Sequence, residues 1–282
     1  AIAFKILRKF ILFSFPTALL SKRTLPLIIC SLTLGACAST TGAMQAETNA
    51  ESNAENYPLS TAVVYQTESK EYPLLSSYVY AQATKALPTS FQPSDVIVMD
   101  VDETVLDNSQ YQREREQQGL GYSSESWNAW IARKEATAVP GVTAFLNEVV
   151  ARGGKVALVT NRDKSMDDAT WQNLLALGLP LTAENTCVLG RTAQDKAAID
   201  GNTVINDKDL RRSQLKQGTV NCSNSTTASK PTWQAQHRLL MQIGDNIEDF
   251  EGVTQEHANV DALLPKVGKS LFILPNPMYG SW

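Results

Sequence analysis

The stretch SDVIVMDVDETVLDNSQ, residues 94–110, places an apolar run directly before a cluster of acidic side chains. The run from Val96 to Met99 is rich in β-branched residues and has polar residues at both ends, which is typical of a buried parallel strand. Open α/β sheets bind their ligands just beyond the carboxyl ends of such strands. Carboxylates gathered there repel one another unless a cation neutralises them. The stretch therefore predicts a parallel α/β sheet with a cation site at its edge.

The rest of the chain supports this architecture. Further apolar runs predict strands at residues 155–160, 186–190, 238–244 and 270–274. Helical patterns over 142–153 and 166–178 each end on Gly. Residues 59–87 have apolar side chains at helical spacing on either side of Pro73, which predicts two helices separated at that proline. The alternation of strands and helices predicts a three-layer α/β domain with a mostly parallel sheet.

Two other predicted strands also end in polar groups. The strand at 155–160 runs into Thr160-Asn161-Arg162, whose hydroxyl and amide groups suit phosphate oxygens. The strand at 238–244 runs into GDNIEDF, which places Asp245 and Asp249 four residues apart. One acidic residue at a strand end is usually a turn or cap residue. Polar groups at three strand ends, with two Asp pairs among them, indicate a single polar site.

The first 37 of the 282 residues have the pattern of an export signal. They contain five basic residues and no acidic one, and they end in the apolar segment TLPLIICSLTLGAC, which is short for a membrane span. The LGAC ending resembles the lipobox of bacterial lipoproteins, in which the cysteine, here Cys37, is lipidated. Ala38 follows, which favours the outer membrane. Residues 38–56 are small and polar, as expected for a flexible tether, and 57–282 form the predicted globular domain.

The net charge and the cysteines indicate which partners and which cross-links the protein can have. Five of the 25 basic residues lie in the predicted signal, so 20 basic residues remain against 29 acidic ones, a net charge of −9. This balance disfavours binding to a nucleic-acid polymer. Cys187 and Cys222 remain after the signal in a compartment that permits disulfides, and the sequence leaves open a bond between them or two free thiols.

The motifs together resemble a known superfamily. DVDETVLDNS, TNR, the Lys-x-x-Arg-Arg run at Lys208 and GDNIEDF are similar to the four motifs of the haloacid dehalogenase (HAD) superfamily, in its branch with four catalytic aspartates. More narrowly, the chain resembles the class C bacterial acid phosphatases, lipoproteins that include outer-membrane 5′-nucleotidases acting on nicotinamide mononucleotide. The resemblance continues through ESWNAWIARKEATAVPG to FILPNPMYGSW. It implies a three-layer Rossmann-like HAD fold with N-terminal helices, a small helical cap-like region and no long inserted cap.

The resemblance also implies roles for individual residues. Asp100 would be the nucleophile that forms an aspartyl-phosphate, and Asp102 the general acid and base. One Mg²⁺ would be held by Asp100, the backbone carbonyl of Asp102 and Asp245, with Asp249 holding metal-bound waters. The remaining implied groups bind phosphoryl oxygens: Thr160, Asn161 and Lys208.

Several assignments have alternatives. Lys230, in the Ser/Thr/Asn-rich segment 219–237, competes with Lys208, although a lysine in such a loop is usually just solvated. Arg211 and Arg212 fit the spacing of the Lys208 motif, and the alternative for them is a solvated helix face. His237 and His257 have no motif context and receive no role.

Two aromatic residues are candidates for substrate recognition. Trp127 and Tyr279 align with the aromatic pair that stacks on both faces of a base or nicotinamide ring in the resembling lipoproteins, which implies a broad site. For Trp130, core packing is favoured.

The sequence therefore predicts a metal-dependent acid phosphatase acting on small phosphomonoesters: nucleoside monophosphates, nicotinamide mononucleotide and aryl phosphates. The alternatives are mutase or dehalogenase chemistry on the same fold, and a non-catalytic surface lipoprotein that binds nucleotides or an aromatic cofactor.

Overall fold

The computed structural model describes residues 57–199 and 205–282, and the predicted signal, Cys37 and tether lie outside these residues. The strands are β1 Asp95–Met99, β2 Leu106–Asp107, β3 Thr137–Ala138, β4 Val156–Asp163, β5 Thr186–Arg191, β6 Arg238–Gly244 and β7 Leu271–Ile273. The α-helices are α1 Thr61–Glu68, α2 Glu71–Ala86, α3 Ser109–Gln117, α4 Ser124–Arg133, α5 Val142–Ala151, α6 Asp167–Ala176, α7 Ala193–Ala197, α8 Asp209–Gln217, α9 Lys230–Trp233 and α10 Val260–Leu263. Two short 3₁₀ helices are η1 Lys164–Met166 and η2 Ile247–Asp249. None of the described helices is both long and apolar enough to span a membrane.

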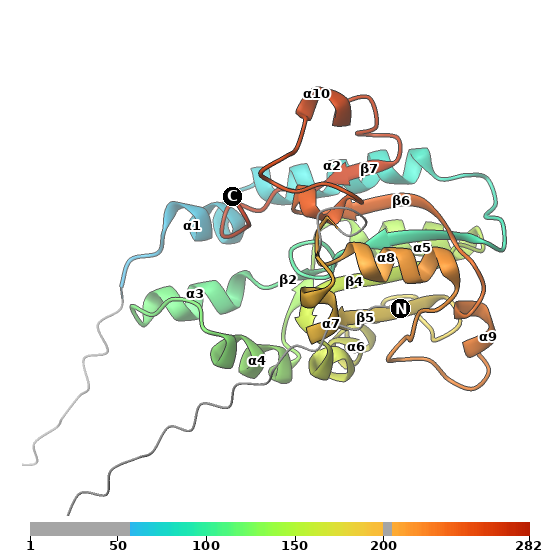
Figure 1. Cartoon of the computed structure of the whole chain (residues 1–282). Coiled ribbons are helices and arrows are strands. Elements are labelled where there is room, and N and C mark those ends of the chain that lie inside the picture. The colour runs from blue at the N-terminus through green and yellow to red at the C-terminus, as the bar shows by residue number, and fades with distance from the viewer. Residues whose placement is uncertain (1–56, 200–204) are drawn as a thin grey trace, which may run out of the picture. The chain divides into compact units, whose positions relative to one another are not determined.

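The central sheet has five strands in the order β5-β4-β1-β6-β7, and every neighbouring pair is parallel (Figure 1). A separate antiparallel ribbon joins β2 to β3. This architecture confirms the predicted α/β fold with a mostly parallel sheet. The sheet order places β1 between β4 and β6, so the carboxyl ends of the three strands with polar ends meet at one edge.

The two faces of the sheet pack against different helices, as the alternation of side chains along β1 requires. Ile97 and Met99 belong to a core with residues of α2, α5 and α6. Val96 and Val98 face the other way and share a second core with Leu215 of α8 and residues of the 219–237 segment. Both faces of β1 are therefore buried, which explains its continuous apolar run.

The break between the two N-terminal helices lies at Ser69 and Lys70, and the prediction of a break at Pro73 was wrong. Pro73 lies in the first turn of α2, where a backbone N–H has no acceptor within the helix, so its absence costs little. The Ser69 hydroxyl accepts a hydrogen bond from the backbone N–H of Tyr72 (3.2 Å), which satisfies one free donor of that turn.

The segment 219–237 is anchored to the sheet at several points. Cys222 forms a disulfide with Cys187 of β5, which answers the question that the sequence left open. Trp233 of α9 is also fully buried, and its indole N–H donates to the carbonyl of Ala183 (2.9 Å). The segment is thus part of the second core, although its composition suggested a solvated loop.

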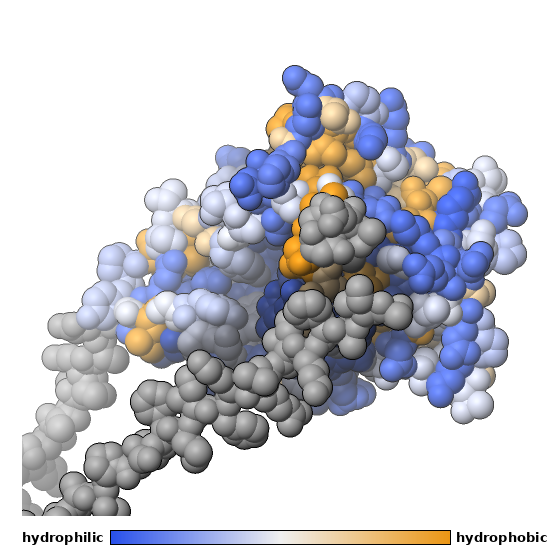
Figure 2. Space-filling model, in the orientation of Figure 1, coloured by the Kyte–Doolittle hydropathy of each residue, from blue (hydrophilic) through white to orange (hydrophobic). Residues whose placement is uncertain are grey.

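The space-filling view shows an apolar area at the top of the molecule, around α10, and smaller apolar areas elsewhere on this face (Figure 2). Three exposed aliphatic residues belong to α10 and the turn after it: Val260, Leu264 and Val267. Most of the remaining coloured surface in this view is hydrophilic or mixed.

Candidate active site

Asp100 lies directly after β1 and is almost fully buried, with 7 % of its surface exposed. Its backbone N–H donates to the carbonyl of Ile243 (3.0 Å), which continues the pairing of β1 with β6. The chain then turns sharply at Glu103, which adopts a positive φ of 52°. The N–H groups of Val105 and Leu106 both donate to the carbonyl of Val101, which closes the turn. This geometry places Asp100 and Asp102 at the carboxyl edge of the sheet.

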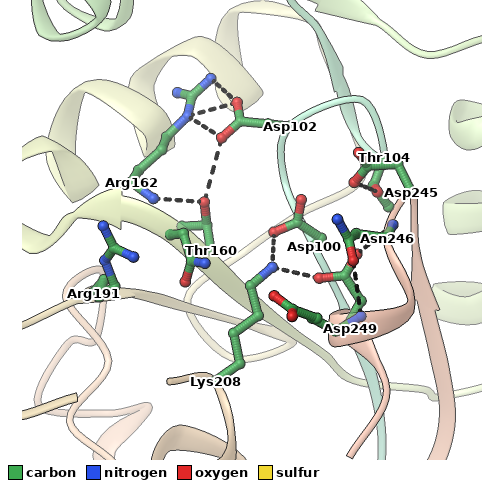
Figure 3. Close-up of polar contacts among 12 residues, drawn as sticks. Asp100, Asp102, Thr104, Thr160, Arg162, Arg191, Lys208, Asp245, Asn246 and Asp249 are labelled. Atoms are coloured by element: carbon green, nitrogen blue, oxygen red, sulfur yellow. Dashed lines mark hydrogen bonds and ion pairs between the residues drawn. The ribbon is translucent and has the colours of Figure 1, made fainter. Parts of the chain in front are cut away.

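Asp102 is held by Arg162, a contact that the sequence did not reveal. The Arg162 guanidinium donates to both carboxylate oxygens of Asp102, with a shortest distance of 2.7 Å, and its side chain is 1 % exposed (Figure 3). Asn108 also donates to Asp102 (2.9 Å). The indole N–H of Trp130 donates in turn to Asn108 (2.9 Å). The Asp102 carboxylate is therefore fixed from two sides, and Trp130 packs in the core as the sequence favoured.

Lys208 contacts two of the predicted acidic residues. Its Nζ lies 2.6 Å from an Asp100 oxygen and also binds Asp249 (Figure 3). Burial raises the pKa of Asp100 to about 7, with Lys208 opposing this rise and Asp249 adding to it. Burial disfavours a charged Lys208, but its two ion pairs outweigh this effect and raise its pKa. A cavity lies above these groups, and Lys208 and Asp100 line it. Lys230 is exposed on α9 and does not line this cavity, so the structure places Lys208, and not Lys230, at Asp100.

Asp245 and Asp249 follow β6 on a turn that requires a glycine. A Cβ at Gly244 would lie 2.0 Å from a carboxylate oxygen of Asp249, so a larger residue there would displace this side chain. Asn246 caps η2, and its backbone N–H donates to Asp249 (3.0 Å). Asn276, which the sequence did not single out, donates to Asp245 (2.8 Å).

Three carboxylates of the site converge on one point. Single oxygens of Asp100, Asp245 and Asp249 all lie within 4.8 Å of one another. Within residues 57–199 and 205–282, Asp245 contacts no cationic side chain. Its pKa is raised well above the usual range, mainly by burial and also by repulsion from Asp249 and Asp100. Three carboxylates with one lysine leave an excess of negative charge. The oxygen ligands and their charge fit a divalent cation.

Thr160 and Asn161 lie at the end of β4, next to Arg162. Thr160 is fully buried, and its hydroxyl accepts a hydrogen bond from the backbone N–H of Arg162 (3.1 Å). Asn161 lines the cavity and accepts a hydrogen bond from Arg211 (3.1 Å). The hydroxyl and the amide therefore lie at the same edge of the sheet as Asp100.

Arg211 and Arg212 do not form the solvated helix face that the sequence left open as an alternative. They are 2 % and 0 % exposed, because α8 packs this face against the ends of the strands and the η2 turn. Arg211 donates to the carbonyls of Thr160 and Leu189 and pairs with Asp195. Arg211 therefore holds the ends of β4 and β5, and Arg212 holds η2 by donating to the carbonyl of Glu248.

The cavity above these groups has a volume of about 530 Å³, and Trp127 and Tyr279 lie in its wall. Their ring centroids are 6.5 Å apart, and the rings meet edge to face at 71°, so they are not parallel in this structure. Trp127 also contacts Tyr111 edge to face and lies 5.8 Å from the Arg162 guanidinium. Arg191, at the end of β5, adds a further cation to the wall.

The sequence profile of the HAD superfamily, subfamily IIIB (acid phosphatase), matches residues 28–282. The chain belongs to this family. The solved structure of the class C acid phosphatase from Bacillus anthracis is 28 % identical, with a TM-score of 0.62, and the match covers 78 % of this chain and 84 % of that one. A tungstate-bound structure of the same enzyme matches over the same shares at 27 % identity and a TM-score of 0.61. This acid phosphatase is therefore a phosphomonoester hydrolase of the family that the motifs resembled, and family enzymes use a divalent metal.

Proposed function

We propose that this acid phosphatase hydrolyses small phosphomonoesters through an aspartyl-phosphate formed on Asp100. The observation that carries the proposal is the position of Asp100, at the cavity, 2.6 Å from Lys208 and within the cluster of three carboxylates. The Asp100 carboxylate would attack phosphorus and release the alcohol. Water would then hydrolyse the acyl phosphate, so that one difficult displacement becomes two easier ones.

Asp102 would serve as the general acid and base. It lines the cavity two residues from the nucleophile, near enough to protonate the leaving alkoxide and then to deprotonate the attacking water. Arg162 and Asn108 hold its carboxylate in one orientation.

The divalent cation would be Mg²⁺, held by Asp100, Asp245 and the backbone carbonyl of Asp102, with Asp249 supporting it through bound water. All of these ligands are oxygen atoms, which Mg²⁺ prefers. When bound, the cation neutralises the clustered carboxylates and lets an anionic nucleophile meet an anionic phosphate.

Thr160, Asn161 and Lys208 would bind the oxygens of the phosphoryl group, and Arg191 would assist them. In the described part of the chain the Arg191 guanidinium hydrogen-bonds and pairs with Asp207 alone (2.7 Å), so its other N–H groups are available to an anion. The tungstate-bound relative supports a site for a tetrahedral oxyanion.

The substrates would be phosphomonoesters with a flat aromatic group: nucleoside monophosphates, nicotinamide mononucleotide and aryl phosphates. Trp127 and Tyr279 lie in the same cavity as Asp100, and the half-buried Trp127 ring meets the rings of Tyr279 and Tyr111 edge to face. A ring that entered between them would turn the two aromatic planes toward parallel. Stacking accepts many rings, because every base has a π face.

A phosphate-release assay tests this proposal. The full chain should release phosphate from p-nitrophenyl phosphate, lose this activity in EDTA and regain it with Mg²⁺. An Asp245→Asn variant should need far more Mg²⁺, whereas Asp261→Asn, an exposed substitution on α10, should behave as wild type. Full activity in metal-free buffer would contradict the cation assignment, and absence of activity in every buffer would contradict the hydrolytic function.

A further inference from the structure

The chain after β7 crosses the carboxyl end of β6. We call residues 274–281 the C-terminal strap. The strap begins where the backbone N–H of Leu274 donates to the carbonyl of Gly244 (2.8 Å). Its far end reaches the cavity, where Tyr279 lies in the wall. The strap therefore connects the turn that carries Asp245 with the proposed aromatic clamp.

Asn276 makes this connection with a single amide group. Its Nδ2 donates to Asp245 (2.8 Å), while its Oδ1 accepts from the backbone N–H groups of Met278 (3.0 Å) and Tyr279 (3.4 Å). A flipped amide would place an oxygen against the carboxylate and N–H groups against N–H groups, so only this orientation satisfies both sides.

The contact from Asn276 is the shorter of two side-chain hydrogen bonds that Asp245 accepts from described residues. The other comes from the Thr104 hydroxyl at 3.5 Å and is weak. Asn276 therefore sets the rotation of the Asp245 carboxylate. The same amide closes the turn that presents the Tyr279 ring to the cavity.

A second hydrogen bond holds the strap on the far side of Tyr279. Asn246 donates to the hydroxyl of Ser281 (2.8 Å), and Asn246 also caps the η2 turn that carries Asp249. Tyr279 is thus flanked by two anchors, and both lead to the acidic cluster.

We propose that Asn276 is a positioning residue that couples cation binding at Asp245 to the stacking of an aromatic ring on Tyr279. A ring that stacks on Tyr279 restrains the turn, and the restrained turn holds Asn276 and Asp245 in the orientation that a cation needs. Ring and cation therefore strengthen each other's binding by the same factor, as thermodynamic linkage requires. This inference rests on the proposed function, because it takes Asp245 as a cation ligand and Tyr279 as part of the clamp.

Calorimetric titration of Mg²⁺ into the full chain, with and without saturating adenosine, tests the coupling. Adenosine has the ring but no phosphate, so no turnover intervenes. Adenosine should tighten the wild-type Mg²⁺ dissociation constant by about fivefold or more, the lower range of typical coupling. The factor should fall to about one in Asn276→Ala.

Two further variants distinguish the loss of the contact between Asn276 and Asp245 from a general disturbance of the fold. Asn276→Ser keeps an uncharged oxygen acceptor for the Tyr279 turn but is too short to donate to Asp245, so it should bind adenosine alone normally and still lose the coupling. Asn259→Ala removes an exposed cap of α10 and should keep the wild-type factor. An equal factor in wild type and Asn276→Ala, with both ligands binding, would overturn this inference alone. Failure of Mg²⁺ or adenosine to bind wild type would overturn it together with the proposed metal site or clamp.

Discussion

Asp100 and Asp102 lie two residues apart in the chain, yet their side chains have different neighbours. Asp100 faces Lys208 and two further carboxylates. Asp102 faces Arg162 and Asn108. The DVDET turn sends one carboxylate toward the acidic cluster and the other toward the end of β4. This division suits a nucleophile and a separate proton-transfer group.

An Asp100→Asn variant should lose turnover by at least about a thousandfold, because the amide keeps the shape of the side chain but cannot act as the nucleophile. Phosphate release from p-nitrophenyl phosphate measures the loss. Thermal unfolding should show an intact fold, since Lys208 keeps Asp249 as a partner. Near-normal activity would exclude the aspartyl-phosphate mechanism.

A Trp127→Ala variant should raise KM for nucleoside monophosphates about tenfold to a hundredfold, corresponding to about 1 to 3 kcal/mol for one stacked base. The KM for a small aliphatic phosphate should change little, and kcat should be nearly unaffected, because the ring is held similarly in the ground and transition states. Initial-rate kinetics on both substrates provide the comparison.

Tyr78→Ala is a matched control, because Tyr78 is an exposed aromatic residue on α2. It should leave both KM values unchanged. If Trp127→Ala instead lost stability and lost activity equally on every ester, Trp127 would only pack the core.

At the scale of elements, the composition of the 219–237 segment does not reveal that the segment is packed into the core. It follows α8 and leads into β6, and it returns to β5 through the disulfide between Cys187 and Cys222. Its last residue, His237, is buried and lies against Trp233.

A Cys222→Ala variant should unfold with a free energy lower by about 2 to 4 kcal/mol, the usual effect of opening a loop of this kind, here 35 residues long. Urea unfolding measures the difference. Dithiothreitol should lower the stability of wild type by a similar amount and leave the variant unchanged. A variant as stable as oxidised wild type would show that the bond adds nothing to stability.

His237 should make the fold less stable in acid. Burial, and then the nearby Lys155 charge, lower the pKa of His237 below its ordinary value of 6.5. Below pH 6.5 the unfolded chain binds a proton at this residue and the folded chain does not. The contribution of His237 to stability is therefore complete above that pH and decreases as the pH falls toward the folded-state pKa.

The free energy of unfolding of wild type and His237→Gln, measured from pH 7.5 to 5, isolates this effect. The difference between the two free energies of unfolding should be constant near pH 7.5. Below about pH 6.5 the wild type should lose stability relative to the variant. A difference that stayed flat over the whole range would show that His237 titrates alike in both states.

At the scale of the whole molecule, the cavity is enclosed by three parts of the chain that are distant in sequence. The sheet edge supplies Asp100, the helical region between β1 and β4 supplies Trp127, and the C-terminal strap supplies Tyr279. Figure 1 shows α3 and α4 beside the sheet rather than over it. A cavity of about 530 Å³ suits small esters, in agreement with the proposed substrates.

The export signal predicted from the sequence leads to a prediction for the intact protein. We propose that Cys37 carries a lipid anchor that holds the enzyme at the outer membrane. Cys37→Ser should then prevent acylation and release the phosphatase domain from the membrane fraction, because the polar segment 38–56 has no apolar surface to retain it. Membrane fractionation with an activity assay measures the release. A variant that stayed in the membrane with an unchanged N-terminus would indicate that residues 1–37 are an uncleaved span.

The strands and the strand-end position of the polar groups follow from the sequence alone. Both are local properties: an apolar run such as Val96 to Met99 indicates its own burial, and parallel strands place their carboxyl ends at one edge. The four motifs identified the superfamily because their residue types and order are specific. The helix break was misjudged at Pro73, because α2 begins at Glu71 and the first turn of a helix tolerates a proline.

Other features depend on contacts between residues far apart in the chain, which no local pattern specifies. Arg162 donates to Asp102, which lies sixty residues away in the chain. The motif favoured Lys208 over Lys230, and the fold brings Lys208 to Asp100. The same holds for the burial of Arg211 and Arg212, the pairing of the cysteines and the link from Asn276 to Asp245. A charged or thiol side chain has the same sequence signal whether it faces water or a partner. Its environment is set when the sheet order brings separate segments together, so only the tertiary structure decided these contacts.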